Sequence, residues 1–106
     1  MNYISVEEVA TKEPVAGYHG RFVHSEHMTL AFWTVVAGAP LPEHQHPHEQ
    51  VLHLQEGIYE LVLNGERMRL EAGSVVVIPG NAPHSGEAIT DCRILDVFHP
   101  VREAYR

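Results

Sequence analysis

Residues 57–71, G-I-Y-E-L-V-L-N-G-E-R-M-R-L-E, constrain the fold of this chain more than any other stretch. They form two runs of alternating side chains that are joined at Asn64-Gly65. Because this dipeptide readily takes the positive φ angles of a two-residue type I′ turn, the stretch predicts a β-hairpin. The fold must therefore contain an antiparallel pair of strands.

Further strands are predicted on both sides of the hairpin. Residues 27–37 are rich in β-branched and aromatic side chains. Residues 75–78 indicate a short buried strand, and residues 92–98 indicate a final one. No helical repeat persists over several turns between residues 20 and 99. Short strands separated by Gly and Pro predict an all-β fold, a small antiparallel β-barrel or jelly roll.

The chain length of 106 residues is typical of one domain, so we expect residues 1–106 to form a single domain. Both faces of the predicted strand 27–37 are largely apolar, which indicates that both are covered. In a small protein the second cover can come from another copy of the chain. Leu95 and Val97 add a further apolar face on the last strand. We therefore expect a homodimer.

The charge balance is acidic, with seven Lys and Arg against fourteen Asp and Glu and a formal charge of -7. This disfavours nucleic acid and anionic membranes as partners, but it is compatible with a small anionic organic substrate held by local arginines. Cys92 is the only cysteine, which excludes an intrachain disulfide and a C-x-x-C site and agrees with a reducing compartment.

The N-terminal residues lack the basic and apolar regions of a signal peptide. No apolar run approaches the roughly 20 residues that a membrane helix needs, so we expect a cytoplasmic protein. Residues 5–10 predict one helical turn, with Ser5 as its cap and Glu8 completing a capping box.

The stretch H-Q-H-P-H-E-Q, residues 44–50, is the strongest candidate for a functional site. In an extended backbone His44, His46 and Gln50 point to the same side, and Glu49 points to the other. Geometry therefore favours Gln50 over Glu49 as the third donor, although Pro47 can break this register. His84 is the best candidate for a fourth donor from elsewhere in the chain.

Neutral imidazoles bind first-row divalent metals well, and a glutamine oxygen adds a harder neutral ligand. The expected cofactor is a divalent transition metal, with Fe, Mn, Ni, Co and Zn all compatible. Such a site keeps the full charge of the ion and so attracts an anionic ligand. The alternative is a group of surface histidines without a metal. The roles of His48, Glu49 and His53 stay open.

Two groups of residues match the spacing of the two cupin motifs. The first group keeps the spacing of the first motif, with Gln in place of the commonest Glu: Gly38, His44, His46, Gln50 and Gly57. The second group departs from its motif at the third and fifth positions but keeps the metal-binding histidine: Gly73, Pro79, Asn81, His84 and Ala88. The chain therefore resembles the cupin superfamily over residues 27–99. The resemblance implies a metal inside the barrel, bound by His44, His46, Gln50 and His84.

The phrase H-P-H-E-Q and the ending D-V-F-H-P-V-R-E-A-Y are similar to single-domain cupins with a Gln metal ligand, among them the pectin- and alginate-degradation proteins that linearise unsaturated uronates. In that family an Asp, a Phe and an Arg near the C-terminus line the substrate pocket. The matching residues are Asp96, Phe98 and Arg102, which keep the D-x-F-x3-R spacing. The resemblance implies catalytic roles for Asp96, Arg102 and Gln50, and substrate binding by Phe98 and Arg102.

The residues themselves leave alternatives open. Asp96 is a carboxylate in an apolar strand, which indicates either a catalytic role or a buried ion pair with Arg102 or Arg93. Arg102 either binds a carboxylate or is a solvated charge, and Phe98 is either core or substrate contact. Tyr59, Tyr105, Trp33 and Met68 show no signal beyond packing or surface cover.

The favoured function is ring opening of a 4,5-unsaturated uronate by a metal-dependent isomerase- or lyase-like sugar-acid enzyme, as the resemblance implies. A metal-dependent dioxygenase and a non-catalytic module that binds a small ligand are the alternatives. The cupin fold supports all three classes, so fold alone does not choose between them.

Overall fold

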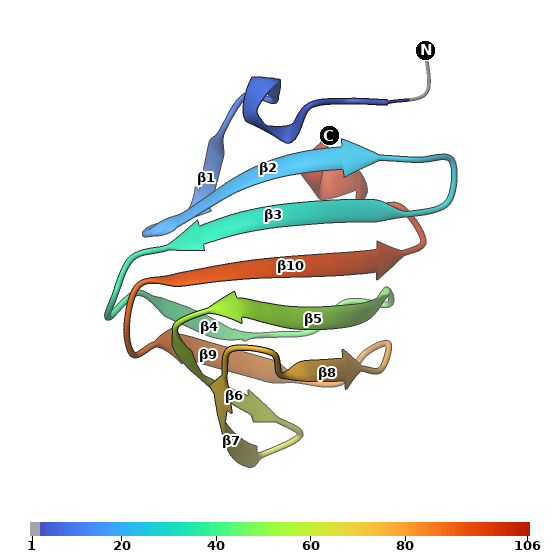
Figure 1. Cartoon of the computed structure of the whole chain (residues 1–106). Helices are drawn as coiled ribbons and strands as arrows, with labels where there is room; N and C mark the ends of the chain where they lie inside the picture. Colours follow the sequence, from blue (N-terminus) through green and yellow to red (C-terminus); the bar gives the residue numbers. More distant parts are fainter. Residues whose placement is uncertain (1–2) are drawn as a thin grey trace.

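The structure, a computed structural model, describes residues 3–106, and Met1 and Asn2 of the predicted domain 1–106 lie outside the described residues. Its strands form two antiparallel sheets that face each other (Figure 1). The six-stranded sheet has the order β1-β2-β3-β10-β5-β8, with bounds Lys12–Val15, Tyr18–His24, Thr29–Val35, Cys92–His99, Glu49–Glu56 and Val75–Ile78. The four-stranded sheet has the order β4-β9-β6-β7, with bounds Pro40–His44, His84–Ala88, Ile58–Leu63 and Glu66–Glu71. The predicted all-β jelly roll is confirmed, although no strand pairing closes the two sheets into one barrel over residues 3–106.

The hairpin that the sequence predicts most strongly is strand pair β6–β7, with Leu63 opposite Glu66. Asn64 and Gly65 both have positive φ angles, 50° and 81°, as a type I′ turn requires. The hairpin prediction is therefore confirmed.

Strand β3 is shorter than the predicted strand 27–37, because residues 25–28 form a turn in which the Ser25 N–H donates to the Met28 carbonyl. One face of β3 is buried, whereas Leu30 and Phe32 on the other face are only half-buried. The expectation that both faces are covered is therefore wrong for the chain by itself. The difference arises because, within residues 3–106, no second sheet covers the outer face of the large sheet, and only N-terminal residues such as Val6 lie near Leu30 and Phe32.

Strand β8 corrects a second expectation. Residues 75–78 were predicted to be buried, but Val75 and Val77 are 58% and 56% exposed. Successive side chains of a strand point to opposite faces, so Val75 and Val77 lie on the outer face of the large sheet even though the run is wholly apolar. The end of the run, Ile78, is fully buried.

The predicted N-terminal turn is present as the 3₁₀ helix η1, Val6–Glu8, but its capping box is wrong. Ser5 occupies the cap position without a side-chain cap bond, because its hydroxyl donates to Glu7 Oε2 at 3.2 Å instead. A second 3₁₀ turn, η2, spans Glu103–Tyr105 at the C-terminus, beside β2 (Figure 1). Across residues 3–106, no helix combines the length and apolar character needed to cross a membrane.

The core fills the space between the two sheets. Its largest fully buried side chains come from both sheets and include Leu54 and Ile78 of the large sheet and Tyr59 and Leu61 of the small one. Cys92 is also buried, as predicted for a small strand residue. The inward faces of β4, β5, β9 and β10 therefore project side chains into one shared interior.

Candidate metal centre

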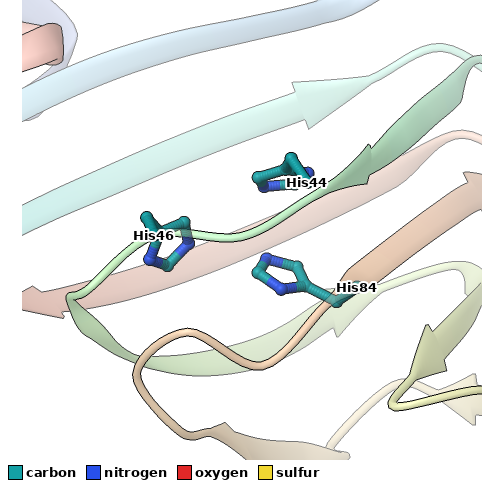
Figure 2. A group of neighbouring side chains, drawn as sticks. All are labelled: His44, His46 and His84. Atoms are coloured by element: carbon teal, nitrogen blue, oxygen red, sulfur yellow. The ribbon is translucent and has the colours of Figure 1, made fainter.

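Three of the predicted ligands meet inside the jelly roll. His44 is the last residue of β4 and His84 the first of β9, and the two are paired across the small sheet. His46 lies in the loop between β4 and β5, and its ring turns toward the other two (Figure 2). One ring nitrogen from each histidine lies within 4.8 Å of the others. Such a triangle of imidazole nitrogens could hold a metal ion.

Two loops pack closely to bring His46 toward His84. A side chain at Gly80 would place its Cβ only 2.5 Å from the Pro47 carbonyl oxygen, so this position needs glycine. The N–H of Asn81 donates to the carbonyl of His46 at 2.7 Å. Asn81 stands where the cupin motif has Gly, and it has a φ of 63°, which asparagine tolerates better than most residues. The departure from the motif is therefore compatible with the loop.

Backbone carbonyls determine which ring nitrogens carry protons. Nδ1 of His44, His46 and His84 lies 2.9, 3.1 and 2.8 Å from the carbonyl oxygens of residues 42, 48 and 82. A carbonyl can only accept, so each Nδ1 carries a proton and each neutral ring keeps a lone pair on Nε2. This is how metal-binding histidines are usually oriented.

The electrostatic environment keeps two of these rings neutral. Burial, followed by the nearby charge of Arg102, lowers the pKa of His46 to about 4. Burial also lowers the pKa of His84. The buried Nε2 of His84 has no hydrogen-bond partner. An unpaired buried acceptor is costly unless something supplies a positive charge, so the donor set fits a cation.

Gln50 is buried and Glu49 is exposed, as the strand alternation predicts. The side-chain amide of Gln50 donates from Nε2 to Asp96 Oδ1 at 2.8 Å. Its Oε1 consequently lies 3.2 Å from His46 Nε2, which is also an acceptor. Two facing acceptors repel each other unless a cation lies between them, so this contact also fits a metal ion.

Asp96 lies inside the cavity, where both of its carboxylate oxygens accept hydrogen bonds. Gln50 donates to one oxygen, and Trp33 Nε1 donates to the other at 3.0 Å. Burial raises the pKa of Asp96 to about 7, although both hydrogen bonds and the charge of Arg102 act in the opposite direction. The carboxyl group is therefore poised between its two protonation states near neutral pH.

The alternative of a buried ion pair at Asp96 is wrong. Among the described residues, neither arginine lies within salt-bridge distance of this carboxylate, and Arg93 instead lies 3.8 Å from Glu56 at the surface. Arg102 is half-buried, with its Cζ 5.0 Å from the ring centre of Phe98 and 4.6 Å from that of Tyr105. Its Nε is buried without a hydrogen-bond partner. Arg102 therefore has donors available for a ligand.

The cavity between these groups has a volume of about 50 Å³, room for a few water molecules. The predicted site residues all line it: His44, His46, Gln50, His84, Asp96, Phe98 and Arg102. Apolar side chains such as Leu52 and Ile78 complete its wall. A chelating and acid–base cluster therefore adjoins a small and largely apolar interior.

Sequence reasoning missed two residues of this site. Trp33 and Tyr105 were assigned to packing alone, yet Trp33 orients Asp96 and Tyr105 covers Arg102. The inward alternation of Trp33 within β3 was a signal for its placement, but nothing local indicated its hydrogen-bond partner. His48 and His53, whose roles were open, lie outside the histidine triangle.

The sequence matches the family model of the cupin domain over residues 16–98. The chain belongs to the cupin family. The match includes the histidine cluster and the strand that carries Asp96. As a cupin with a convergent group of histidines, the protein has a site suited to a divalent metal. No curated protein matches it in sequence.

Several solved structures are similar to this one. KdgF from Halomonas sp. has 25% sequence identity and a TM-score of 0.92, with 100% of this chain and 99% of that chain covered. An RmlC-like cupin from Shewanella frigidimarina has 21% identity and a TM-score of 0.93, with 100% and 96% covered. Bacillus subtilis oxalate decarboxylase, studied for its Mn(II) centres, has 19% identity and a TM-score of 0.79, with 92% of this chain and 29% of that chain covered.

Proposed function

We propose that this cupin is a metal-dependent enzyme that opens the ring of a 4,5-unsaturated uronate to its linear keto form. The metal would be held by His44, His46, His84 and Gln50. The observation that carries the proposal is the direct hydrogen bond from Gln50, beside the histidine triangle, to the buried carboxyl of Asp96. It puts a potential acid–base group next to a potential metal site.

The substrate class rests on two likenesses. The residues of the metal motif and of the D-x-F-x3-R ending resemble those of cupins that linearise unsaturated uronates. The whole chain is also similar to KdgF at 25% identity over nearly the full length of both proteins. We propose that the family resemblance extends to the reaction.

The chemistry needs a proton to leave the hemiacetal hydroxyl and another to arrive at carbon 4 of the enol ether. Loss of the first proton lets the bond between carbon 1 and the ring oxygen break, and the electron pair of that bond stays on the oxygen, which gives an aldehyde and an enolate. Protonation of carbon 4 then converts the enolate to the ketone, so one proton leaves and one is returned. A carboxyl group with a pKa of about 7, such as Asp96, can hold a proton and release it at neutral pH.

The other residues would bind and orient the substrate. Arg102 would hold its carboxylate in a two-pronged geometry, and Phe98 would pack against the ring. Gln50 would keep Asp96 in place through its amide. A bound divalent metal would supply Lewis acidity toward the carboxylate and the enol system.

The experiment is an absorbance assay on the metal-loaded protein. Ring opening removes the conjugated alkene, so the ultraviolet absorbance of unsaturated galacturonate or of mannuronate-derived monomers should fall faster than in buffer. A rate equal to the spontaneous one, with metal fully loaded, would reject the reaction. Oxygen uptake with a small-molecule substrate would then favour the dioxygenase class, and ligand-induced thermal stabilisation without turnover would favour a binding module.

We also propose that two copies of the chain pair through the outer face of the large sheet. Leu30, Phe32 and Val97 are only half-buried there, and Val75 and Val77 are more than half exposed. Exposed apolar side chains on neighbouring strands are typical of interaction surfaces. Sedimentation as an 11.9 kDa monomer at micromolar concentration would contradict this pairing.

A further inference from the structure

We propose that His24 and Thr29 are positioning residues for Arg102, and that they hold its guanidinium at the cavity so that it captures the carboxylate of the substrate. The inference rests on the proposed function, in which Arg102 binds that anion. Neither His24 nor Thr29 lines the cavity. They act on it through the C-terminal residues 102–105.

The hydrogen bonds between this pair and the C-terminal residues have one consistent direction. The carbonyl of Tyr105, 3.3 Å from His24 Nε2, can only accept, so Nε2 carries the ring proton. Nδ1 of neutral His24 is then an acceptor, and the Thr29 hydroxyl donates to it at 2.8 Å. The same hydroxyl oxygen accepts the N–H of Arg102 at 2.9 Å. The pair therefore holds both ends of residues 102–105.

Strand register explains why the pair lies at this place. Thr29 is opposite His24 on β2 and opposite Phe98 on β10. All three therefore lie at the same end of the large sheet, where the chain leaves β10 toward Arg102. Thr29 is fully buried, and its hydroxyl uses both its proton and a lone pair in this network. Valine would match its shape but could form neither bond.

The side chains of residues 102–105 are confined as well. Tyr105 stacks on Phe22 with ring centres 4.4 Å apart and planes 9° apart. The guanidinium of Arg102 lies near the rings of both Tyr105 and Phe98. A guanidinium that is already confined loses less side-chain entropy when it binds an anion. Correct placement of Arg102 thus depends on correct placement of Tyr105.

The loop that carries His46 makes an additional contact with the same segment. Nε2 of His48 lies 3.2 Å from the carbonyl oxygen of Val101, so it donates to that carbonyl. Val101 immediately precedes Arg102. This bond gives His48 a structural role outside the histidine triangle, and it links the candidate metal loop to the arginine.

The test measures anion binding with galacturonate, a saturated uronate, as the probe. Trp33 is the only tryptophan, and its ring centre is 5.8 Å from that of Tyr105, so its fluorescence should report binding at the cavity. Thr29→Val removes both hydrogen bonds and should weaken galacturonate binding about fivefold to tenfold, the size expected for the loss of one net hydrogen bond. Thr29→Ser keeps the hydroxyl and should restore wild-type binding.

Two further variants separate positioning from a general structural effect. The double variant Thr29→Val/Arg102→Ala should bind no more weakly than Arg102→Ala, because the pair acts through that arginine. His24→Gln changes the other member of the pair and keeps the threonine at position 29. It should also weaken galacturonate binding. The matched control is His27→Gln, since the side chain of His27 is 72% exposed and lies 3.7 Å from Glu26.

With unsaturated uronate as substrate, Thr29→Val should raise KM by the same factor and leave kcat within about twofold, since a positioning residue for the anion makes no contact with the reacting atoms. Equal weakening by Thr29→Val in the presence and absence of Arg102 would overturn the inference, and so would unchanged binding in both Thr29→Val and His24→Gln. Wild-type protein that fails to bind galacturonate would also overturn it. Binding without turnover would reject only the proposed reaction.

Discussion

The two ends of the interior between the sheets differ in what they bury. Within residues 3–106, the buried polar or charged side chains other than tyrosine and tryptophan all belong to the end with the candidate metal centre, which we call the mouth end: Thr29, His46, Gln50, His84 and Asp96. At the opposite end, the closed end, the buried side chains are apolar: Val35, Leu54, Ala88 and Cys92.

This difference indicates that the two ends contribute in different ways to stability. Burial of apolar side chains at the closed end stabilises the fold. At the mouth end, burial disfavours the charged form of Asp96, and His84 Nε2 has no partner. Polar groups buried at this expense in stability are typical of functional sites. The fold should therefore tolerate changes at the mouth end that abolish function.

The largest expected effect is loss of the metal at the mouth end. Replacing His44 and His46 by Ala removes two of the three convergent imidazoles, so stoichiometric metal should disappear in elemental analysis. The variant should still fold, because neither ring belongs to the hydrophobic core. Unchanged metal content would show that these residues are not the ligands.

Next in size is the effect of Asp96→Asn on turnover. General acid–base groups contribute about 10²–10⁴-fold, so turnover of unsaturated uronate should fall by that factor. Bound metal should stay near the wild-type level, because all three histidines are retained. Activity within about threefold of wild type would remove Asp96 from the proposed mechanism.

The closed end should show the reverse behaviour. Leu54 is fully buried, and its backbone bonds to Gly73 and Ser74 fix it in place. Leu54→Ala should lower the free energy of unfolding by about 2–5 kcal/mol, whereas metal content and KM should stay near wild type. Denaturant unfolding beside elemental analysis would measure both. A variant that lost metal before it lost stability would break the contrast between the two ends.

The sequence predicted the features that depend on neighbouring residues. It missed the hydrogen bonds between residues that lie far apart in the chain. The hairpin turn was predictable because its preference is contained in the dipeptide Asn64-Gly65. The inward orientation of Gln50 was predictable because side chains alternate in any extended backbone. The partners of Trp33 and Thr29 depend on which strands become neighbours in the sheet. That pairing joins residues more than sixty positions apart, as in the bond between Trp33 and Asp96. No local pattern contains it.

The pH dependence of the metal-free protein separates the buried groups of the mouth end. His46 has a pKa of about 4 when folded against an ordinary value of 6.5, so between these values the unfolded chain binds more protons. Stability should therefore fall as pH decreases from about 6.5 to about 4. Asp96 has the opposite sign, because its raised pKa makes stability fall as pH increases from about 4 to about 7.

Asp96→Asn removes the opposing effect and should expose that of the histidines. In this background the free energy of unfolding should decrease by about 2–3 kcal/mol between pH 6.5 and pH 4. Adding His46→Gln should reduce that slope. Denaturant titrations at several pH values, with chelator present, would measure it, and a slope that persisted without His46 would assign it to other groups.

The smallest effects are expected from two tyrosines of the cavity wall, whose hydroxyls lie 2.8 Å apart. Tyr18 donates to the Ala39 carbonyl at 3.2 Å, so Tyr59 must donate to Tyr18. Tyr59→Phe leaves the bond from Tyr18 to Ala39 intact and should cost about 0.5–1.5 kcal/mol of unfolding free energy. Tyr18→Phe leaves the buried Tyr59 hydroxyl without an acceptor and should cost more, about 1–3 kcal/mol.

Denaturant unfolding of both variants checks the order of the two losses in unfolding free energy, and neither variant should change metal content. A larger loss in Tyr59→Phe would reverse the assigned hydrogen-bond direction, and loss of metal in either variant would show that these hydroxyls support the metal centre.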